Sequence, residues 1–349
     1  MLNNSAALKL LDHRGSLLYQ WLEVNTSLEF IDFEMVSGDA SFRRYFRLTH
    51  TTGTLIAVDA PPQYENNPAF VGVAKGLMQA KLNVPEIIAT DYEQGFMLLS
   101  DLGDVQLLNQ LNPQNVNRWY QHALEELVKL QQAQDFPDYS LPEYDRKLLM
   151  EEMAFMPEWF LQKHLSLEIS EEEENNLYSL FERLCDLAKS QPQVTTHLDY
   201  HSRNLMVLEN QRIGIIDFQD AVIGAVSYDL ISLVKDCYIK WPQTKVDGWM
   251  RDYHQMLVQA GVRNLPPIDE FIFLADAMAL QRHIKVVGIF ARLYQRDGKA
   301  QYLDDIPLTL EYLMETCERY AEFNQFGDWL KQKIIPAFNQ KQQNLKEQS

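Results

Sequence analysis

The sequence predicts an α+β fold of two lobes, with a small antiparallel sheet in the N-terminal lobe and a larger, mainly helical C-terminal lobe. Short runs of aromatic and aliphatic residues between positions 33 and 100 are typical of strands. After Gly103, apolar residues recur with the spacing of amphipathic helices. The 349 residues are enough for two lobes with a core each. We expect these lobes at residues 1–103 and 104–349.

The N-terminal lobe is expected to begin with an amphipathic helix over residues 5–24, because leucines and a tryptophan recur near one face. Gly38 and Gly53 then break the chain between short β-rich runs. The order of three strands, a helix and two strands suits a small lobe built on one sheet. The expected elements are strands at Phe33–Val36, Arg43–Leu48 and Leu55–Asp59, a helix at Asn67–Leu82, and strands at Glu86–Thr90 and Phe96–Ser100.

The C-terminal lobe is expected to be built from long helices on both sides of one hairpin. The helix at 170–190 has the clearest start, because Ser170 and Glu173 have the spacing of a capping box. The expected helices cover residues 115–134, 143–164, 170–190, 227–239, 244–260, 268–294 and 306–340.

The overall composition limits the class of protein. The chain has 31 basic and 49 acidic residues, a net charge of −18, which argues against a nucleic-acid partner. We expect no membrane partner and no signal peptide, since we find no run of eighteen apolar residues and no basic segment leading into an apolar one. Three widely spaced cysteines do not form a disulfide framework. We expect a cytoplasmic protein, and no obligate protein partner is visible in the sequence.

The most informative segment runs from Thr195 to Asp220 and contains a catalytic-type motif. An H-x-D-x-x-x-x-N pattern is followed by an aspartate at the end of an apolar run. Phosphoryl transfer from a nucleotide needs one carboxylate that orients the acceptor hydroxyl, and an amide and a second carboxylate that hold magnesium. Asp199 fits the first role, and Asn204 and Asp217 fit the others.

The spacing of this motif predicts a β-hairpin. Strands at 204–208 and 212–216, joined by a turn at 209–211, would bring Asn204 and Asp217 together at one mouth. One amide and one carboxylate are a plausible protein contribution to a magnesium site. The alternative is a polar loop followed by an ordinary hairpin in which Asp217 is a turn residue.

This motif resembles the catalytic signature of the aminoglycoside phosphotransferase and choline kinase superfamily. The resemblance extends over roughly residues 30–325 and implies a protein-kinase-like fold, small-molecule kinase activity, and ATP and Mg²⁺ as cofactors. Asp229 is similar to the aspartate of that superfamily's D-L-A segment, which implies that it supports the catalytic loop through backbone hydrogen bonds. His197 is likewise expected to be structural. The residues that carry the resemblance are His197, Asp199, His201, Asn204 and Asp217.

A narrower resemblance is to the bacterial cell-wall sugar kinases, which phosphorylate N-acetylmuramate and N-acetylglucosamine at the anomeric hydroxyl during cell-wall recycling. This resemblance implies that the present chain phosphorylates the anomeric hydroxyl of one or both of these amino sugars. The similar phrases are GDASFRRYFRL, VDAPP, MLLSDLGD, MPEWFLQKHL, HLDYHSRNLMVL and QRHIKVVGIFARL.

The nucleotide is expected to bind the N-terminal lobe. Backbone N–H groups of the turn at 37–41 would line the triphosphate, and the segment at 98–102 would read adenine. The alternatives are a common hairpin turn and a simple linker. The candidates are Ser37, Gly38, Asp39, Ala40, Ser41, Arg43, Arg44, Ala57, Leu99, Ser100, Asp101 and Leu102.

Two positions depart from the kinase pattern. Asp59 occupies the place where the third strand of a kinase offers a lysine to the phosphates. Either Arg43 or Arg44 replaces that cation, with strand alternation sending them to opposite faces, or both are solvated. Asp59 could also face away, pair with Lys75, or impair nucleotide use. Gln219 stands where many kinases have glycine, which suggests a less mobile metal loop.

The acceptor site is expected to combine polar groups with an aromatic face. His201 and Asp220 flank the reaction centre and could bind sugar hydroxyls. Glu152 and Trp159 lie about two turns apart on one predicted helix, so Trp159 could stack on a pyranose ring or pack in the core instead.

Positive charge for an acidic sugar could come from Arg282, with His283 and Lys285 beside it, although these residues could equally form a solvated helical face. The leading interpretation is an ATP-dependent kinase for the anomeric hydroxyl of an amino sugar. The alternatives are a kinase for an aminoglycoside or choline-like substrate, whose positive charge would suit an acidic protein, and a nucleotide-binding pseudoenzyme. The absent lysine favours the last of these, and the complete catalytic motif opposes it.

Overall fold

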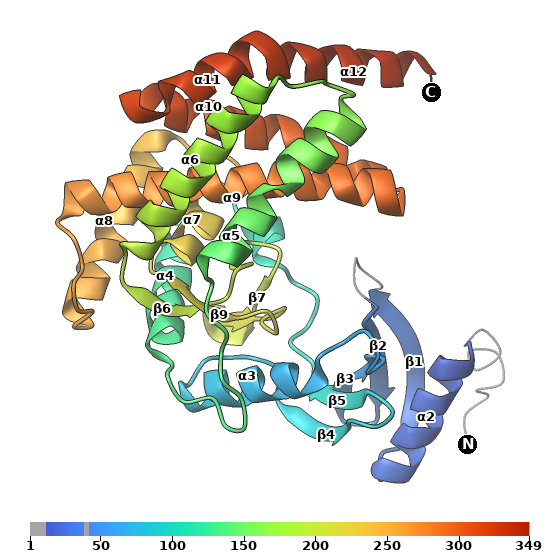
Figure 1. The fold of residues 1–349 in the computed structure, drawn as a ribbon. Coiled ribbons are helices and arrows are strands. Elements are labelled where there is room, and N and C mark those ends of the chain that lie inside the picture. Colours follow the sequence, from blue (N-terminus) through green and yellow to red (C-terminus); the bar gives the residue numbers. More distant parts are fainter. Residues whose placement is uncertain (1–11, 38–41, 349) are drawn as a thin grey trace. The chain divides into compact units, whose positions relative to one another are not determined.

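The computed structural model describes residues 12–37 and 42–348 (Figure 1). The chain forms two compact units, each made of separate segments, and the predicted α+β architecture is confirmed. Unlike the lobes predicted from the sequence, the N-terminal unit also takes in the hairpin that carries Asn204 and Asp217. Of the described residues, the N-terminal unit comprises 12–37, 42–110, 132–141 and 203–221, and the helical unit comprises 111–131, 142–202 and 222–348.

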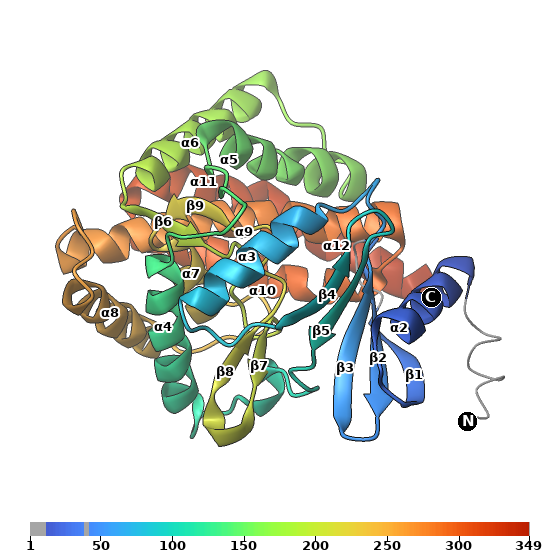
Figure 2. The same ribbon diagram turned by 90° about the horizontal axis from the view of Figure 1, so that it is seen from below.

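An antiparallel sheet of five strands forms the centre of the N-terminal unit, in the order β1-β2-β3-β5-β4 (Figure 2). The predicted succession of three strands, a helix and two strands is confirmed, and the first three strands extend beyond their predicted ends. The strands are β1 (Phe30–Ser37), β2 (Arg44–His50), β3 (Gly53–Asp59), β4 (Ile87–Asp91) and β5 (Phe96–Ser100), and α3 (Asn67–Gln79) lies between β3 and β4 in the chain.

Helix α2 (His13–Asn25) packs on one face of this sheet. Its Leu18 and Trp21 join Phe46 and Ala57 in a buried core, because alternate strand residues point to the same face. Two leucines of the predicted amphipathic face lie in residues 1–11, outside the described residues. Since Ala57 lies on the α2 face, its neighbour Val58 points to the opposite one.

Segment 132–141 belongs to the N-terminal unit because α3 packs closely against it. A Cβ atom added at Gly76 would lie 2.3 Å from the ring of Phe136, and one at Gly72 would lie 2.4 Å from Tyr139. Glycine is required at both positions for this approach. The unit is completed by the short hairpin β7 (Leu205–Val207) and β8 (Ile213–Ile215), which is drawn as a separate pair of strands in Figure 2.

The helical unit is organised around α9 (Ile268–Asp297), which is buried along most of its length and packs against most other helices of the unit (Figure 1). A helix buried on all sides is normally apolar, so its charged residues need partners. The other α-helices of the unit are α4 (Val116–Gln132), whose last residue is grouped with the N-terminal unit, α5 (Arg146–Met153), α6 (Glu171–Lys189), α7 (Tyr228–Val234), α8 (Gln243–Gln259), α10 (Ile306–Arg319), α11 (Asn324–Trp329) and α12 (Ile335–Gln348).

Two predictions for the helical unit needed correction. The expected helix at 143–164 is interrupted after α5 and continues as the π-helix η2 (Met156–His164), since Pro157 has no N–H to donate to the turn before it. The expected helix at 306–340 is divided among α10, η5 (Ala321–Phe323), α11, the π-helix η6 (Leu330–Ile334) and α12. The strands β6 (Gln193–Thr196) and β9 (Val222–Ala225), which pair with each other, and the 3₁₀ turn η4 (Ala300–Asp305) were not predicted. In the N-terminal unit, the 3₁₀ turn η1 (Leu107–Gln110) was not predicted, and η3 (Glu209–Gln211) lies at the predicted turn of the hairpin.

The predicted capping box at the start of α6 is confirmed. Ser170 accepts a hydrogen bond from the backbone of Glu173, and the Glu173 side chain accepts one from the backbone of Ser170. The three cysteines are buried and free. Within the described residues, no helix has the length and apolar character needed to cross a membrane.

Candidate active site

The loop that follows β6 holds Asp199 in the helical unit, and Asp229 of α7 is hydrogen-bonded to the backbone of this loop. The Asp229 carboxylate accepts hydrogen bonds from the N–H groups of His197, at 2.6 Å, and Leu198, at 3.0 Å. Leu198 has a φ of 73°, a left-handed conformation that costs a leucine energy. The two hydrogen bonds therefore fix a strained turn immediately before Asp199. They are bonds of the kind expected of Asp229, while its effect on catalysis stays a prediction.

A second set of hydrogen bonds, which the sequence did not reveal, holds the part of the loop that follows Asp199. Asp236 is fully buried and accepts hydrogen bonds from the N–H of Ser202 at 2.9 Å and from its hydroxyl at 2.5 Å. Tyr200, also fully buried, donates its hydroxyl to the carbonyl of Ala123 at 2.7 Å. Nothing in the local pattern around Asp236 distinguishes it from an ordinary helix-end aspartate.

The surroundings of Asp199 favour its ionised form. Burial raises the pKa of its carboxyl, but the charges of Lys285, His201, Arg282 and His197 together bring that pKa below its ordinary value. Its backbone N–H donates to Nδ1 of His197 at 3.2 Å, which fixes the position of the residue. Asp199 is therefore a carboxylate at neutral pH and can accept a proton or hydrogen bond from a hydroxyl group.

The hairpin in the N-terminal unit brings Asn204 and Asp217 together, although its strands are shorter than predicted. Leu205 pairs with Ile215, and the N–H of residue 216 donates to the carbonyl of Asn204 at 3.1 Å. The Asp217 carboxylate is exposed and accepts hydrogen bonds from the amides of Asn204, at 3.3 Å, and Gln219, at 3.0 Å. An amide oxygen and a carboxylate at one mouth fit the oxygen preference of magnesium.

Asp217 has a φ of 65°, which is unusual for an aspartate and places its carboxylate just beyond the end of β8. Among the described residues, no group of three or more histidine, cysteine or acidic side chains could bind a metal unaided. A magnesium ion held by Asn204 and Asp217 would therefore need phosphate oxygens and water to complete its coordination.

The residues predicted to bind the nucleotide lie in the turn at 37–41, in the segment at 99–102, and on strands β2 and β3 or just before them. Gly38, Asp39, Ala40 and Ser41 lie outside the described residues, and Ser37 is the last residue of β1. Just after β5, Asp101 accepts hydrogen bonds from Arg47. At the end of β5, the Ser100 hydroxyl accepts a hydrogen bond from the N–H of Glu86. Leu99 is buried, and Leu102 is half-buried.

Ala57 requires a correction. It is fully buried in the core beneath α2, so the structure does not place it against a nucleotide. Strand alternation instead sends Ile56 and Val58 to the opposite face of the sheet.

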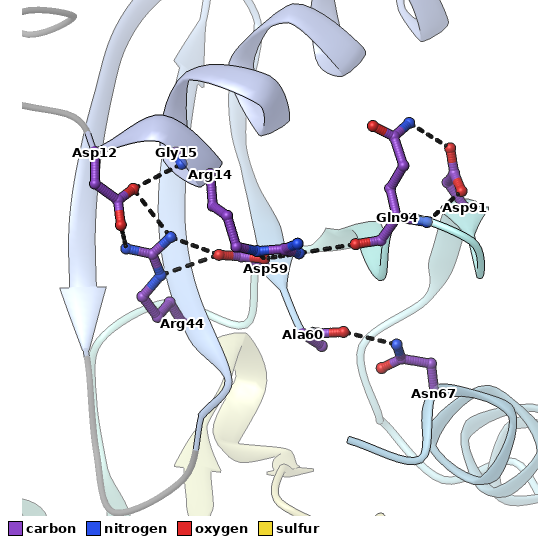
Figure 3. Close-up of polar contacts among 9 residues, drawn as sticks. All are labelled: Asp12, Arg14, Gly15, Arg44, Asp59, Ala60, Asn67, Asp91 and Gln94. Carbon is purple, nitrogen blue, oxygen red and sulfur yellow. Dashed lines mark hydrogen bonds and ion pairs between the residues drawn. The ribbon is translucent and has the colours of Figure 1, made fainter. Parts of the chain in front are cut away.

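Asp59 also faces α2, and it is paired with two arginines there (Figure 3). Its fully buried carboxylate accepts hydrogen bonds from Arg14, at 2.8 and 2.5 Å, and from Arg44, at 3.0 and 2.5 Å. Arg44 also pairs with Asp12 at 2.8 Å, and Lys75 is exposed rather than paired with Asp59. Asp59 is thus the centre of a buried ion cluster, and Arg44 is committed to it.

We expect the replacement of Asp59 by alanine to destabilise the protein by about 3 kcal/mol, because Arg14 and Arg44 would lose the carboxylate that compensates them. The estimate is at the lower end of the usual range, since both arginines are partly exposed. Asp59→Lys should unfold this unit rather than restore a kinase lysine. The matched control is Asp104→Asn, whose carboxylate is 71% exposed and should contribute less than about 1 kcal/mol. Equal unfolding free energies in urea for Asp59→Ala and the wild type would contradict this.

Arg43 has different neighbours from Arg44. It is buried, pairs with Glu65 at 3.1 Å, and lies over the ring of Phe70. The ring of Phe70 also contacts the ring of Phe218, the residue after Asp217, with ring centroids 5.0 Å apart. Arg43 is therefore connected through one aromatic ring to the loop that carries Asp217.

Tyr45 connects the same groups from β2. Burial raises its pKa to about 12, and the charges of Arg43, Asp217 and Glu65 all act on its hydroxyl. The ion pair of Arg43 and Glu65 and the Asp217 carboxylate therefore lie within electrostatic range of one side chain. The structure thus separates the two arginines, with Arg44 in the cluster beneath α2 and Arg43 near the loop that carries Asp217.

The predicted acceptor residues in the helical unit form a buried polar cluster. Lys285 donates to Glu152 at 2.8 Å and to the hydroxyl of Tyr228 at 3.3 Å. Glu152 also accepts a hydrogen bond from Tyr144. The sequence indicated Glu152, but it did not indicate Tyr144 or Tyr228, because apolar patterns do not distinguish core tyrosines from site tyrosines.

The other predicted acceptor residues are less closely associated. Trp159 lies on η2, beyond the break after α5, and packs against the helical core with the Lys163 ammonium 3.4 Å from its ring centroid. Glu152 and Trp159 therefore lie on two successive helical segments instead of the one predicted helix, and a role of Trp159 in sugar binding stays a prediction. His201 contacts the ring of Tyr238 in the helical unit, whereas Asp220 is exposed in the N-terminal unit and accepts from Gln219 at 3.4 Å.

The three basic residues at 282–285 are not a solvated face. Arg282, His283 and Lys285 lie in the middle of α9, and each is at least nine-tenths buried. Arg282 and Lys285 are thus two buried cations whose charges act on Asp199, an arrangement typical of a functional site rather than of a helix surface.

Comparison with known proteins decides the family. Residues 32–270 match the phosphotransferase enzyme family, known as APH, over more than half of the chain. The chain belongs to the APH phosphotransferase family. Its predicted kinase class is therefore confirmed.

Curated relatives within this family are similar over most of their length. The N-acetylmuramate/N-acetylglucosamine kinase of Pseudomonas aeruginosa is 41% identical over 84% of this chain and 86% of its own. The kinase of the same name from Neisseria meningitidis is 37% identical over 87% of this chain and 91% of its own.

Solved structures support the kinase-like fold. An ethanolamine kinase from Plasmodium vivax has a TM-score of 0.62 at 13% identity and covers 89% of both chains. An ADP-bound aminoglycoside phosphotransferase has a TM-score of 0.59 at 12% identity, covering 88% of this APH family member and 99% of that chain. The predicted resemblance to aminoglycoside phosphotransferases and choline kinases is confirmed at the level of fold.

Proposed function

We propose that this APH family member is a cytoplasmic ATP-dependent kinase that phosphorylates the anomeric hydroxyl of an amino sugar, N-acetylmuramate or N-acetylglucosamine or both. The observation that carries the proposal is the ionised Asp199 beside the buried cations of α9. Its loop is held by hydrogen bonds to Asp229 and Asp236. The names of the curated relatives support the choice of sugar, and the ADP bound to a structural neighbour supports a nucleotide donor.

In this reaction Asp199 accepts the proton of the sugar hydroxyl as its oxygen forms a bond to the γ-phosphorus. The bond from that phosphorus to the bridging oxygen breaks, and ADP leaves. Lys285 and Arg282 keep Asp199 ionised in its partly buried position, so the base is ready at neutral pH. His197 and Asp229 hold the backbone of the loop, which keeps the carboxylate in one place.

Asn204 and Asp217 are the residues that would hold Mg²⁺, which neutralises charge on the phosphate oxygens when it is bound. Their donor set fits the ion, because Asp217 offers two carboxylate oxygens whose hydrogen-bond donors are the neutral amides of Asn204 and Gln219. Turning the Asn204 amide would present its oxygen in place of its N–H.

Arg43 is the residue that we propose in place of the usual phosphate-binding lysine. We expect Arg43→Ala to raise the Michaelis constant for ATP tenfold to a hundredfold, since a charge-assisted phosphate contact is worth about 1.5 to 3 kcal/mol. Arg44→Ala should change that constant little and lower the melting temperature instead, because Arg44 pairs with Asp59. Steady-state kinetics with both variants decide between them. If neither changes the constant for ATP, the phosphate cation lies elsewhere, and Lys75 becomes the next candidate.

The proposed function is tested by incubating the protein with Mg-ATP and each candidate acceptor. We expect ADP release and a sugar 1-phosphate, identified by ³¹P NMR, with N-acetylmuramate or N-acetylglucosamine. Choline and an aminoglycoside should be poor acceptors, because the buried cations of α9 repel positive charge. ADP release with those cations alone would favour the alternative kinases. Binding of nucleotide without phosphorylation of any acceptor would favour a pseudoenzyme.

A further inference from the structure

The three basic residues of α9 differ in how far their hydrogen-bonding capacity is used. His283 contacts the carbonyl of Lys235 at 3.0 Å, and burial lowers its pKa well below the ordinary value, so it is neutral. Lys285 is committed to Glu152 and a tyrosine hydroxyl. Arg282 remains, and it is only 3% exposed.

The guanidinium of Arg282 is poorly satisfied. Its Nη1 donates to the Cys237 sulfur at 3.4 Å, and its Nε has no hydrogen-bond partner. A thiol is a weak acceptor, whereas a guanidinium offers five N–H donors in a planar fork. Burying a guanidinium whose N–H groups lack hydrogen-bond acceptors is costly, unless a ligand supplies those acceptors.

The position of Arg282 indicates where such a ligand would bind. It stands one turn before Lys285 on α9, and its charge acts on Asp199 and on Tyr228. It therefore lies on the acceptor side of the helical unit, near the proposed base. The fork geometry of a guanidinium matches a carboxylate better than a hydroxyl group.

We infer that Arg282 binds the carboxylate of an acidic amino sugar and so sets the preference between acidic and neutral acceptors. This inference rests on the proposed function. N-acetylmuramate has a lactyl carboxylate, and N-acetylglucosamine has a hydroxyl at the same ring position. Both can present the anomeric hydroxyl to Asp199, and only the acid supplies a carboxylate for the Nε of Arg282, which has no hydrogen-bond partner.

The test is the ratio of kcat/KM for N-acetylmuramate to that for N-acetylglucosamine. We expect Arg282→Gln to lower this ratio by roughly tenfold to a hundredfold, the range for loss of a charge-assisted hydrogen bond. Arg282→Lys retains the charge without the fork and should give an intermediate ratio. Loss of activity toward both sugars with an unchanged ratio would overturn the inference, and would make Arg282 a counter-charge for Asp199.

A second measurement needs no variant, in case Arg282→Gln does not fold. Binding of 1-deoxy-N-acetylmuramate and of its methyl ester to the wild-type protein is compared by calorimetry in the presence of the ATP analogue AMP-PNP and Mg²⁺. We expect the acid to bind at least tenfold more tightly than the ester. Equal affinities would overturn the inference while leaving the sugar kinase intact. A wild-type protein that phosphorylates neither sugar would instead remove the proposed function.

Discussion

Replacing Asp217 by alanine should abolish Mg²⁺-dependent turnover while the protein stays folded. The carboxylate is exposed and accepts hydrogen bonds from two neutral amides, so its removal costs little stability. The catalytic cost is large, because metal coordination at a transferring phosphoryl group supplies several kcal/mol, or a factor of about 10³ or more. Asn204→Ala should have a smaller effect and raise the Mg²⁺ concentration needed for half-maximal rate.

Turnover of these variants is measured across a Mg²⁺ titration, with melting temperatures recorded in parallel. Asp91→Asn is the matched control, since it removes a carboxylate at the end of β4 that also accepts hydrogen bonds from a glutamine. It should leave the Mg²⁺ dependence unchanged. Ordinary turnover by Asp217→Ala at ordinary Mg²⁺ would mean that the metal site has been assigned to the wrong hairpin.

The sequence could predict those parts of the fold that depend on local patterns. Alternation and glycine breaks were sufficient for the five strands of the sheet, and a capping box located the start of α6. The meeting of Asn204 and Asp217 could also be predicted, because a short hairpin fixes which residues face each other across its mouth.

Contacts between distant segments could not be predicted in this way. Arg14 and Asp59 are 45 residues apart, and nothing in either neighbourhood indicates that α2 covers that face of the sheet. The sequence suggested that Asp59 occupies a phosphate-binding position. Only the strand register of the structure shows that its side chain faces α2. The sequence also left open whether Arg282 and Lys285 supply charge to a site or form a solvated helical face, because charged residues are rarely buried.

The remaining large effect concerns the base. Asp199→Asn should lower turnover by about 10² to 10⁴, the range for loss of a general base. The amide has nearly the same shape, and the backbone N–H can still donate to His197, so the fold and the affinity for ATP should be retained. Turnover and melting temperature are measured together. Near-normal turnover would remove Asp199 from the mechanism, and a large fall in melting temperature would indicate a structural role.

The pH dependence of the wild type gives an independent check on the same residue. Burial raises the pKa of Asp199, and the charge of Lys285, first among the opposing causes, lowers it below the ordinary value. The carboxylate is therefore ionised down to unusually low pH, and kcat/KM should decline only as the pH falls below the usual aspartate range. Lys285→Met removes that charge, so the acid limb of kcat/KM should move to higher pH. An acid limb at the same pH in both proteins would show that Asp199 is not the group that titrates.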